Sequence, residues 1–206
     1  NELTRLNNEF PLWTIRMMHQ TWFNSSVPFN RGFKFALTRN PEIIILLNAE
    51  CYHAGDILGY AEDNVTDNNV ISFPCYSLSK DDTLPPEQMN NKGASHDGES
   101  AWYNHPVYRP VGYHFCMAIT ADNLRKLNGF DERFAYGIGY DDNYFIQQIK
   151  NLGLMIDIPY EPFVFHQWHY TNKNNDSALI KKNADLFNSL QGDLSFRAEH
   201  LITPDL

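Results

Sequence analysis

The sequence predicts an α/β domain built on a mostly parallel sheet flanked by helices. Two observations predict this class. Short segments rich in β-branched residues alternate with helix-like segments, and the apolar run Ile43–Leu47 is typical of a strand buried on both faces. With 206 residues and 43% apolar content, the chain has the size of one domain, residues 1–206. Because such sheets bind ligands beyond the carboxyl ends of their strands, the segment after Leu47 is the first place to look for a site.

Each further element has a local signal. Apolar residues at helical spacing predict helices from Asn30 to Leu37 and over 55–60, 121–127, 142–152 and 176–190. Thr120 is a good N-cap for the third of these helices, and Asn128 followed by Gly129 is a typical left-handed stop. Strands are expected at 15–19, 70–73, 114–120, 155–158 and 163–166. Between residues 76 and 110 the periodicity is lost, and a loop of that length is usually functional.

Composition excludes several classes of function. The net charge of −9 argues against a nucleic-acid surface, which needs a basic stripe. The longest aliphatic run is far shorter than the roughly 20 residues of a membrane span, so no transmembrane segment is expected. Three widely spaced cysteines without a CxxC pair favour a reducing compartment over a disulfide scaffold. The expected location is the cytoplasm, either free or peripheral to a membrane.

Three groups of polar residues are candidates for chemistry. Glu50 follows the apolar strand and is placed to bind a divalent cation, although a solvated loop acid is the plainer interpretation. Asp141 and Asp142 follow a double-glycine turn at a helix start; the helix dipole explains one acid, and the second is free to act as a general base. His166 and His169 end a strand, where side chains three apart face opposite ways, so only one would reach a given site if the strand continued.

The segment 123–152 strongly resembles the second half of GT-A-fold glycosyltransferases. The resemblance is to the inverting family 2 and to the galactosyltransferase and N-acetylgalactosaminyltransferase modules. Asn128–Glu132 matches their GGFDE-like turn with Asn in place of the first Gly, and Gly139–Asp142 matches their GxED motif with Asp in place of Glu. Upstream, Phe29–Leu37 looks like the start of the family's N-x-G-x-A-x-N helix.

This resemblance implies a glycosyltransferase that moves a sugar from a nucleotide-sugar donor to the hydroxyl of a glycan or glycoconjugate, with inversion. Asp142 would be the general base, and Asp141 would hold the acceptor or the base. A divalent cation, Mn²⁺ or Mg²⁺, would sit on the donor diphosphate and act as a Lewis acid. The remaining implied roles are metal binding by Glu50, His166 and His169, donor binding by Asn30, Arg31 and Asn48, and acceptor binding by Trp102, Tyr103, Gly139 and Tyr140. The loop 76–110 would frame the acceptor, and residues 171–206 would form a C-terminal lid and helix.

Two departures from the family pattern keep other functions open. Asn48-Ala49-Glu50 stands where the family has DxD, so the cation site has one carboxylate instead of two. The strand, helix and strand that open GT-A domains and hold the nucleotide have no counterpart before Phe10, so we expect a GT-A domain incomplete at its N-terminus. One alternative is a non-catalytic, sugar- or partner-binding module with a degenerate fold. The other is a metal-dependent hydrolase that uses Glu50, His166 and Asp142.

Overall fold

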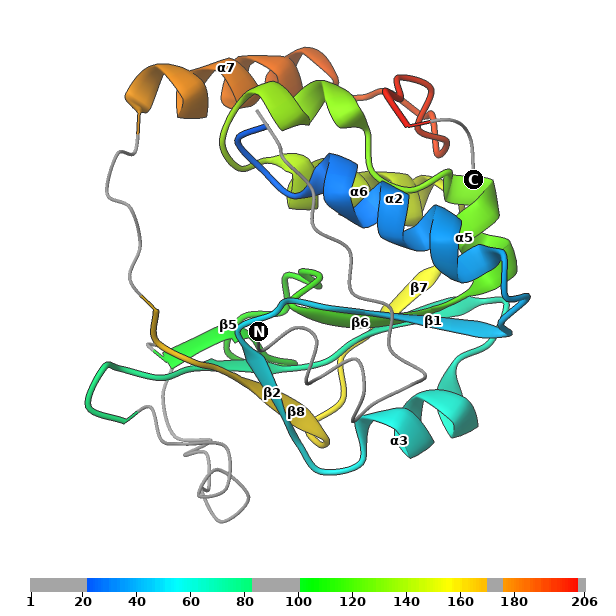
Figure 1. Ribbon diagram of the computed structural model, residues 1–206, viewed down its shortest axis with the longest axis vertical. Helices are drawn as coiled ribbons and strands as arrows, with labels where there is room; N and C mark the ends of the chain where they lie inside the picture. The colour runs from blue at the N-terminus through cyan, green and yellow to red at the C-terminus, as the bar shows by residue number, and fades with distance from the viewer. Residues whose placement is uncertain (1–21, 83–100, 170–175, 204–206) are drawn as a thin grey trace, which may run out of the picture.

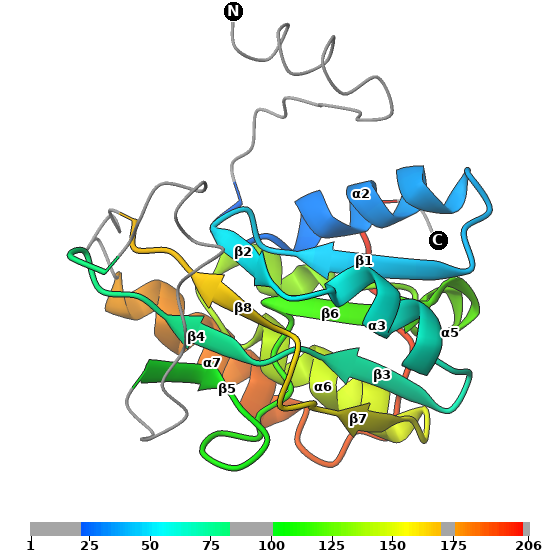
Figure 2. The same cartoon turned by 90° about the horizontal axis from the view of Figure 1, so that it is seen from below.

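Two small sheets, joined by strands that pass from one into the other, form the centre of the computed structural model, which describes residues 22–82, 101–169 and 176–203. The first sheet has the order β1 (Ile43–Leu47), β6 (Cys116–Thr120), β3 (Asn69–Ser72) and β7 (Met155–Asp157). The second has the order β2 (Cys51–Ala54), β8 (Phe163–His166), β4 (Cys75–Ser77) and β5 (Trp102–Asn104). Figure 2 shows the two sheets side by side, with β1 leading into β2 and β3 leading into β4.

Both sheets are mixed, so the prediction of a mostly parallel sheet is wrong. In the first sheet β6 is antiparallel to β1 and β3, and only β3 and β7 are parallel. In the second sheet β8 is antiparallel to β2 and parallel to β4, which is antiparallel to β5. Parallel neighbours need long crossover connections. Here only Asn48–Glu50 separates β1 from β2, so the chain moves on into the other sheet instead of crossing back.

Helices cover both faces of the first sheet (Figure 1). Above it lie α2 (Ser26–Leu37), α5 (Ala121–Leu127) and α6 (Asp141–Asn151), with α7 (Ser177–Ser189) against α6; below it lies α3 (Ile57–Asn64). The upper core contains Phe33, Leu124 and Phe145, and the lower core contains Ile57 and Phe73. No described helix is long and apolar enough to cross a membrane.

Several expected elements are confirmed at their local signals. The Thr120 side chain accepts a hydrogen bond from the Asn123 amide and caps α5, and Asn128 ends that helix with φ of 63°. Strand β8 has the expected bounds, whereas α2 begins at Ser26, earlier than expected. The loop expected over 76–110 contains β4 residues at its start and β5 near its end. The strand expected at 15–19 and the lid expected from 171 to 175 lie outside the described residues.

Strand β1 shows how both faces of one edge strand are used. Ile44 and Leu46 point into the upper core, while Ile43, Ile45 and Leu47 pack against the lower core and keep partial exposure. Among the described strands β1 lies at the edge of its sheet, which explains why its burial alternates instead of being continuous. The prediction of apolar contacts on both faces is confirmed, and the prediction of complete burial is wrong.

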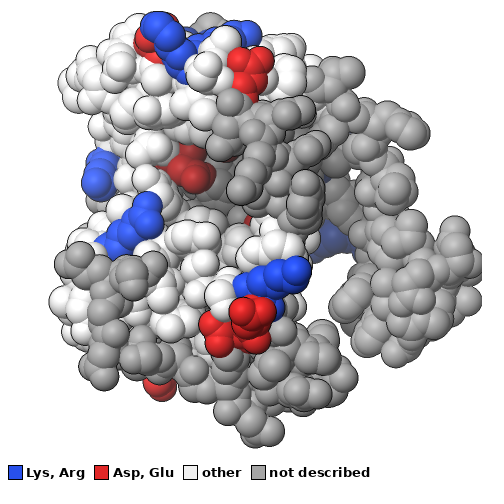
Figure 3. Space-filling model, turned by 90° about the vertical axis from the view of Figure 1, so that its left-hand side faces the viewer, with Lys and Arg blue, Asp and Glu red and all other residues white. Residues whose placement is uncertain are grey.

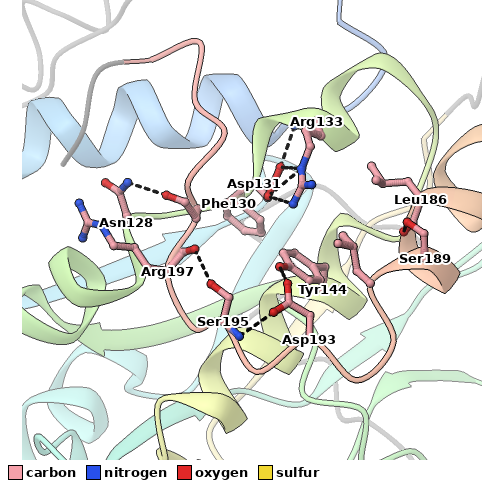
Figure 4. Close-up of polar contacts among 12 residues, drawn as sticks. Asn128, Phe130, Asp131, Arg133, Tyr144, Leu186, Ser189, Asp193, Ser195 and Arg197 are labelled. Atoms are coloured by element: carbon pink, nitrogen blue, oxygen red, sulfur yellow. Dashed lines mark hydrogen bonds and ion pairs between the residues drawn. The ribbon is translucent and has the colours of Figure 1, made fainter.

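The C-terminal segment 190–203, here called the strap, crosses the helical layer and holds the turn after α5 (Figure 4). Asn128 Nδ2 donates to the Ala198 carbonyl over 2.7 Å, and the Ala198 amide donates to the Leu127 carbonyl over 2.8 Å. On α6, the Tyr144 hydroxyl donates to Asp193 Oδ2 over 3.2 Å. The strap therefore fixes the chain that leads toward the two acids of α6.

Candidate functional site

Glu50 lies in the turn between β1 and β2, beside the end of β8. The Cys51 amide donates to the Asn48 carbonyl over 2.9 Å and closes the turn. The Gln167 amide donates to the Glu50 carbonyl over 3.0 Å, which ties the turn to the residue after β8. As a result, Glu50 Oε1 lies 3.4 Å from His166 Nε2.

Both histidines reach Glu50 because β8 ends at His166. The next residues leave the strand, so the rule that side chains three apart face opposite ways does not apply, and the His166 and His169 ring centroids lie 5.4 Å apart. One ligand atom from each of Glu50, His166 and His169 lies within 4.8 Å of the other two. Imidazole nitrogens and a carboxylate oxygen are a suitable set for a divalent transition metal ion.

The surroundings of Glu50 favour its ionised form. The hydrogen bond with His166 lowers the pKa of Glu50 to about 2, against the opposing effect of burial. Asn48 Nδ2 donates to Glu50 Oε1 over 3.3 Å, while Asn48 Oδ1 is buried without a hydrogen-bond partner among the described residues. A buried oxygen without a partner, on a side chain that contacts Glu50, fits a site that accepts a cation.

The two acids of α6 follow a turn in left-handed backbone conformation. Gly139 has φ of 70° and Tyr140 has φ of 67°, and Tyr140 directly precedes the helix. Asp141 is buried, and that burial, followed by the charge of Asp142, raises the pKa of Asp141 to about 6. Asp142 keeps 31% of its side chain exposed and contacts the imidazole of His114.

Helix α7 holds the turn that precedes these acids. Asn183 Nδ2 donates to the carbonyls of Phe134 (2.9 Å) and Gly139 (2.7 Å), and the Ile138 amide donates to the Leu179 carbonyl (3.2 Å). A side chain at Gly137 would collide with Asn183, so glycine is required there for close packing. The position of Asp142 therefore depends on contacts from the far end of the sequence.

The segment Tyr113–Phe115 connects the two halves of the site. Phe115 packs edge-on against His166 with centroids 5.8 Å apart, and the adjacent His114 contacts Asp142. Burial lowers the pKa of His114, but the charges of Asp142, Asp141 and Glu50 outweigh it and the net pKa is raised. Glu50 is thus close enough to act electrostatically on the residue that holds Asp142. On the face of the molecule that Figure 3 shows, acidic side chains lie recessed between its upper and lower parts.

His114 is the site residue that the sequence interpretation missed. The signal available for it is a histidine at the start of an apolar strand segment, a position where a polar ring needs a partner. That signal names no partner, because Asp142 is brought to it only by the packing of α6 on the sheet.

Two residues predicted to bind the donor, Asn30 and Arg31, already have partners within the protein. Asn30 is fully buried; its Nδ2 donates to the Phe130 carbonyl (2.8 Å) and to Glu132 Oε1 (3.0 Å), and its Oδ1 accepts from the Phe130 amide (2.8 Å). It joins α2 to the turn after α5 and has no group left for a nucleotide. Arg31 is exposed and lies over the ring of Trp22, 4.8 Å from its centroid.

The two aromatic residues predicted to bind the acceptor, Trp102 and Tyr103, have different surroundings. Trp102 lies in the core, and Tyr103 lies against the cation group, as we call Glu50, His166 and His169. Trp102 is 1% exposed and packs against Tyr76 and Phe163, so no face of its ring is open to a sugar. Tyr103 stacks on Phe115 at 5.2 Å and meets His166 edge-on at 5.1 Å, so it supports the imidazole. Alternation along β5 places the two side chains on opposite faces.

An open groove of about 410 Å³ runs along α6 from Asn143, the residue after Asp142. Tyr113 and Phe187 supply aromatic surface, and Gln147 and Lys150 supply polar groups. Asn143 Nδ2 donates to the Tyr113 hydroxyl over 3.3 Å, which joins the groove to the segment that connects the two halves of the site.

Comparisons with known proteins give only distant likenesses, all of them among solved structures. No family model matches the chain, and no curated protein matches it. Among solved structures, the catalytic domain of Drosophila β1,4-galactosyltransferase 7 in complex with xylobiose is similar with a TM-score of 0.45 and 15% sequence identity. The similarity covers 87% of this chain and 71% of that one. At this distance it assigns neither an activity nor site residues.

Proposed function

We propose that the protein transfers a sugar from a nucleotide-sugar donor to the hydroxyl of a glycan or glycoconjugate, with inversion at the anomeric carbon. One observation carries this proposal: the group of three potential metal ligands and the Asp142 carboxylate both contact the segment Tyr113–Phe115, through Phe115 and His114 respectively. A displacement that expels a nucleoside diphosphate needs positive charge at the leaving group and a base at the attacking hydroxyl. The order of motifs along residues 123–152 supports the same reaction.

Glu50, His166 and His169 would hold a divalent cation, and Asn48, whose amide contacts Glu50, carries a further oxygen without a partner among the described residues. When bound, the cation would neutralise charge on the donor diphosphate and make it a better leaving group. Two imidazole nitrogens favour a transition metal ion such as Mn²⁺ over Mg²⁺. The low pKa of Glu50, about 2, keeps this ligand ionised throughout the physiological range.

Asp142 would act as the general base for the acceptor. The acceptor hydroxyl loses its proton to the Asp142 carboxylate while its oxygen bonds to the anomeric carbon and the bond to the diphosphate breaks. The groove that begins at Asn143, the residue after Asp142, would hold the acceptor, with Tyr113 and Phe187 against the sugar rings and Tyr140 next to Phe187, their ring centroids 5.7 Å apart. Asp141, buried behind the base, would position it instead of touching the acceptor.

Nucleotide release tests the proposal directly. The protein is incubated with UDP-, GDP- and dTDP-sugars with and without Mn²⁺, and the released nucleoside diphosphate is measured. We expect slow, Mn²⁺-dependent hydrolysis of at least one donor. Glu50→Gln should weaken Mn²⁺ binding in calorimetry by at least about tenfold. Glu62→Gln, at an exposed acid of α3, is the matched control and should bind Mn²⁺ like the wild type.

The other outcomes identify the alternatives. Donor binding without turnover would indicate a non-catalytic sugar-binding module. Activity on a phosphoester or ester without any sugar donor would indicate a metal-dependent hydrolase. Either result would overturn the proposed transfer reaction.

A further inference from the structure

His114 lies just before β6, and two aromatic rings enclose it. Its ring meets Phe29 of α2 edge-on at 5.3 Å and Phe130 at 4.9 Å. Only 8% of the side chain is exposed. Two aromatic rings therefore fix the plane of the imidazole, and buried rings in such contacts do not change rotamer freely.

The polar edge of this ring faces Asp142. His114 Nδ1 contacts Asp142 Oδ1, and neither atom is accessible to solvent. Since Oδ1 is inaccessible, the 31% of the Asp142 side chain that is exposed lies on its other atoms, which include Oδ2. One carboxylate oxygen is thus held inside the protein, and Oδ2 is the oxygen left to meet a ligand.

The charges around His114 favour a proton on Nδ1. The elements packed against it contribute Phe29 from α2, Phe130 from the turn after α5, Asp141 and Asp142 from α6, and the charge of Glu50 from the β1–β2 turn. Burial disfavours the imidazolium, but these three carboxylates outweigh it and raise the pKa of His114. The neutral tautomer protonated at Nδ1 also carries an N–H at this contact, so a hydrogen bond to Asp142 Oδ1 would not require the charged ring.

From this geometry we infer that His114 is a positioning residue of the transfer reaction, in addition to Asp141: it holds Oδ1 of Asp142 so that Oδ2 faces the acceptor hydroxyl. The inference rests on the proposed function. In the step, Oδ2 takes the hydroxyl proton, the acceptor oxygen bonds to the anomeric carbon, and the electron pair of the breaking bond leaves with the nucleoside diphosphate. His114 neither gains nor loses a proton in this step.

A base that is free to rotate presents either oxygen at variable distance, and misplacement of a reacting group by about 1 Å can lower the rate by about 10²-fold. His114→Phe keeps the aromatic packing with Phe29 and Phe130 and removes the donor. We expect kcat for transfer to fall by about 10²-fold. The KM for donor and acceptor and the affinity for Mn²⁺ should stay close to their wild-type values, because the Glu50 group is not touched.

Two further variants separate positioning from a structural role. His114→Asn keeps a short side chain with an N–H donor near the position of Nδ1 and should recover part of the lost kcat. In an Asp142→Asn background, His114→Phe should cause no additional loss, because the carboxylate that it positions is already absent. His200→Phe, at an exposed histidine of the strap, is the control and should leave kcat unchanged.

A substrate-free measurement covers the case in which the variants fold poorly. NMR titration of the imidazole resonances should show His114 losing its proton at a lower pH in Asp142→Asn than in the wild type. An unchanged titration would show that the pair does not form and would overturn the inference.

The failures of the two proposals are distinguishable. If the wild type transfers sugar and His114→Phe matches it, or if the loss is fully additive with Asp142→Asn, only the positioning role fails. If the wild type transfers no sugar, the proposed function fails, and the positioning role fails with it.

Discussion

Two carboxylate–histidine pairs contact the segment Tyr113–Phe115, and they are built in opposite ways. Glu50 comes from a turn and His166 from a strand end, and Glu50 Oε1 lies 3.4 Å from His166 Nε2. The exposed His169 is the third member of this group. Asp142 and His114 are closer, and the histidine is enclosed by Phe29 and Phe130. Among the described residues, only the Glu50 group brings three metal-ligand side chains together.

The difference shows what each pair is suited to do. A spaced, partly exposed group with ligand atoms to spare can admit a cation without rearrangement of the core. A tight pair with a buried partner leaves one carboxylate oxygen for an outside proton and fixes its direction. Under the proposed function, the same two residue types would serve charge neutralisation in one place and proton transfer in the other.

The largest expected effect comes from removing the base and leaving the cation group intact. Asp142→Asn keeps the size of the side chain, and we expect sugar transfer to fall by about 10²–10⁴-fold because a general base contributes about that much. Calorimetry with Mn²⁺ should give wild-type affinity. Normal turnover by this variant would remove Asp142 from the reaction and end the comparison between the two pairs.

A smaller effect is expected from loosening the scaffold behind the Asp142 pair. Asn30→Leu leaves the Phe130 amide and carbonyl and Glu132 Oε1 without their buried partner. We expect the free energy of unfolding to fall by about 3 kcal/mol, measured by urea denaturation. Asn68→Leu, at an exposed asparagine, is the control. A loss no larger than that of the control would show that Asn30 does not anchor this turn.

The smallest effect concerns the buried acid beside the base. The raised pKa of Asp141, about 6 against a usual 3.8, means that the folded protein holds a proton between these pH values that the unfolded chain has released. Its stability therefore falls as pH rises through that window. Asp141→Asn removes the penalty, so the variant should be more stable than the wild type above pH 6, on the order of 1 kcal/mol, and not below pH 4.

Thermal unfolding at several pH values measures this gain. Asp122→Asn, at an exposed acid in the first turn of α5, is the matched control and should show no stabilisation at high pH. A stability difference that does not vary with pH would contradict the burial of an ionised Asp141.

Sequence reasoning succeeded where the signal is local. The N-cap at Thr120, the left-handed stop at Asn128 and the bounds of β8 depend on neighbouring residues, and the structure confirms them. The gathering of Glu50, His166 and His169 has no local signal: it was implied by the family resemblance, whereas strand alternation favoured only one of the two histidines, and the ligand atoms of all three lie together.

It failed where partners are far apart along the chain. Asn30 meets Phe130 across 100 positions, and no local pattern distinguishes a buried crosslink from a ligand contact. Strand direction was misjudged because β1 and β3 continue into the second sheet, which alternation of elements does not reveal. Trp102 was placed in a loop because the strand that covers it, β4, is short and lies far upstream.

The three buried cysteines can report how often the lower core opens. All three thiols are free and buried, and Cys51, Cys75 and Cys116 belong to the lower core, which Cys51 joins to Glu50, the residue before it. Burial raises the pKa of the Cys75 and Cys116 thiols well above the usual range. A thiol reagent in solution modifies buried thiols when the core around them opens. The rate of modification therefore measures how often the lower core opens. Labelling with and without Mn²⁺ would then time the motion of that region without a substrate, a spectroscopic tag or an engineered residue.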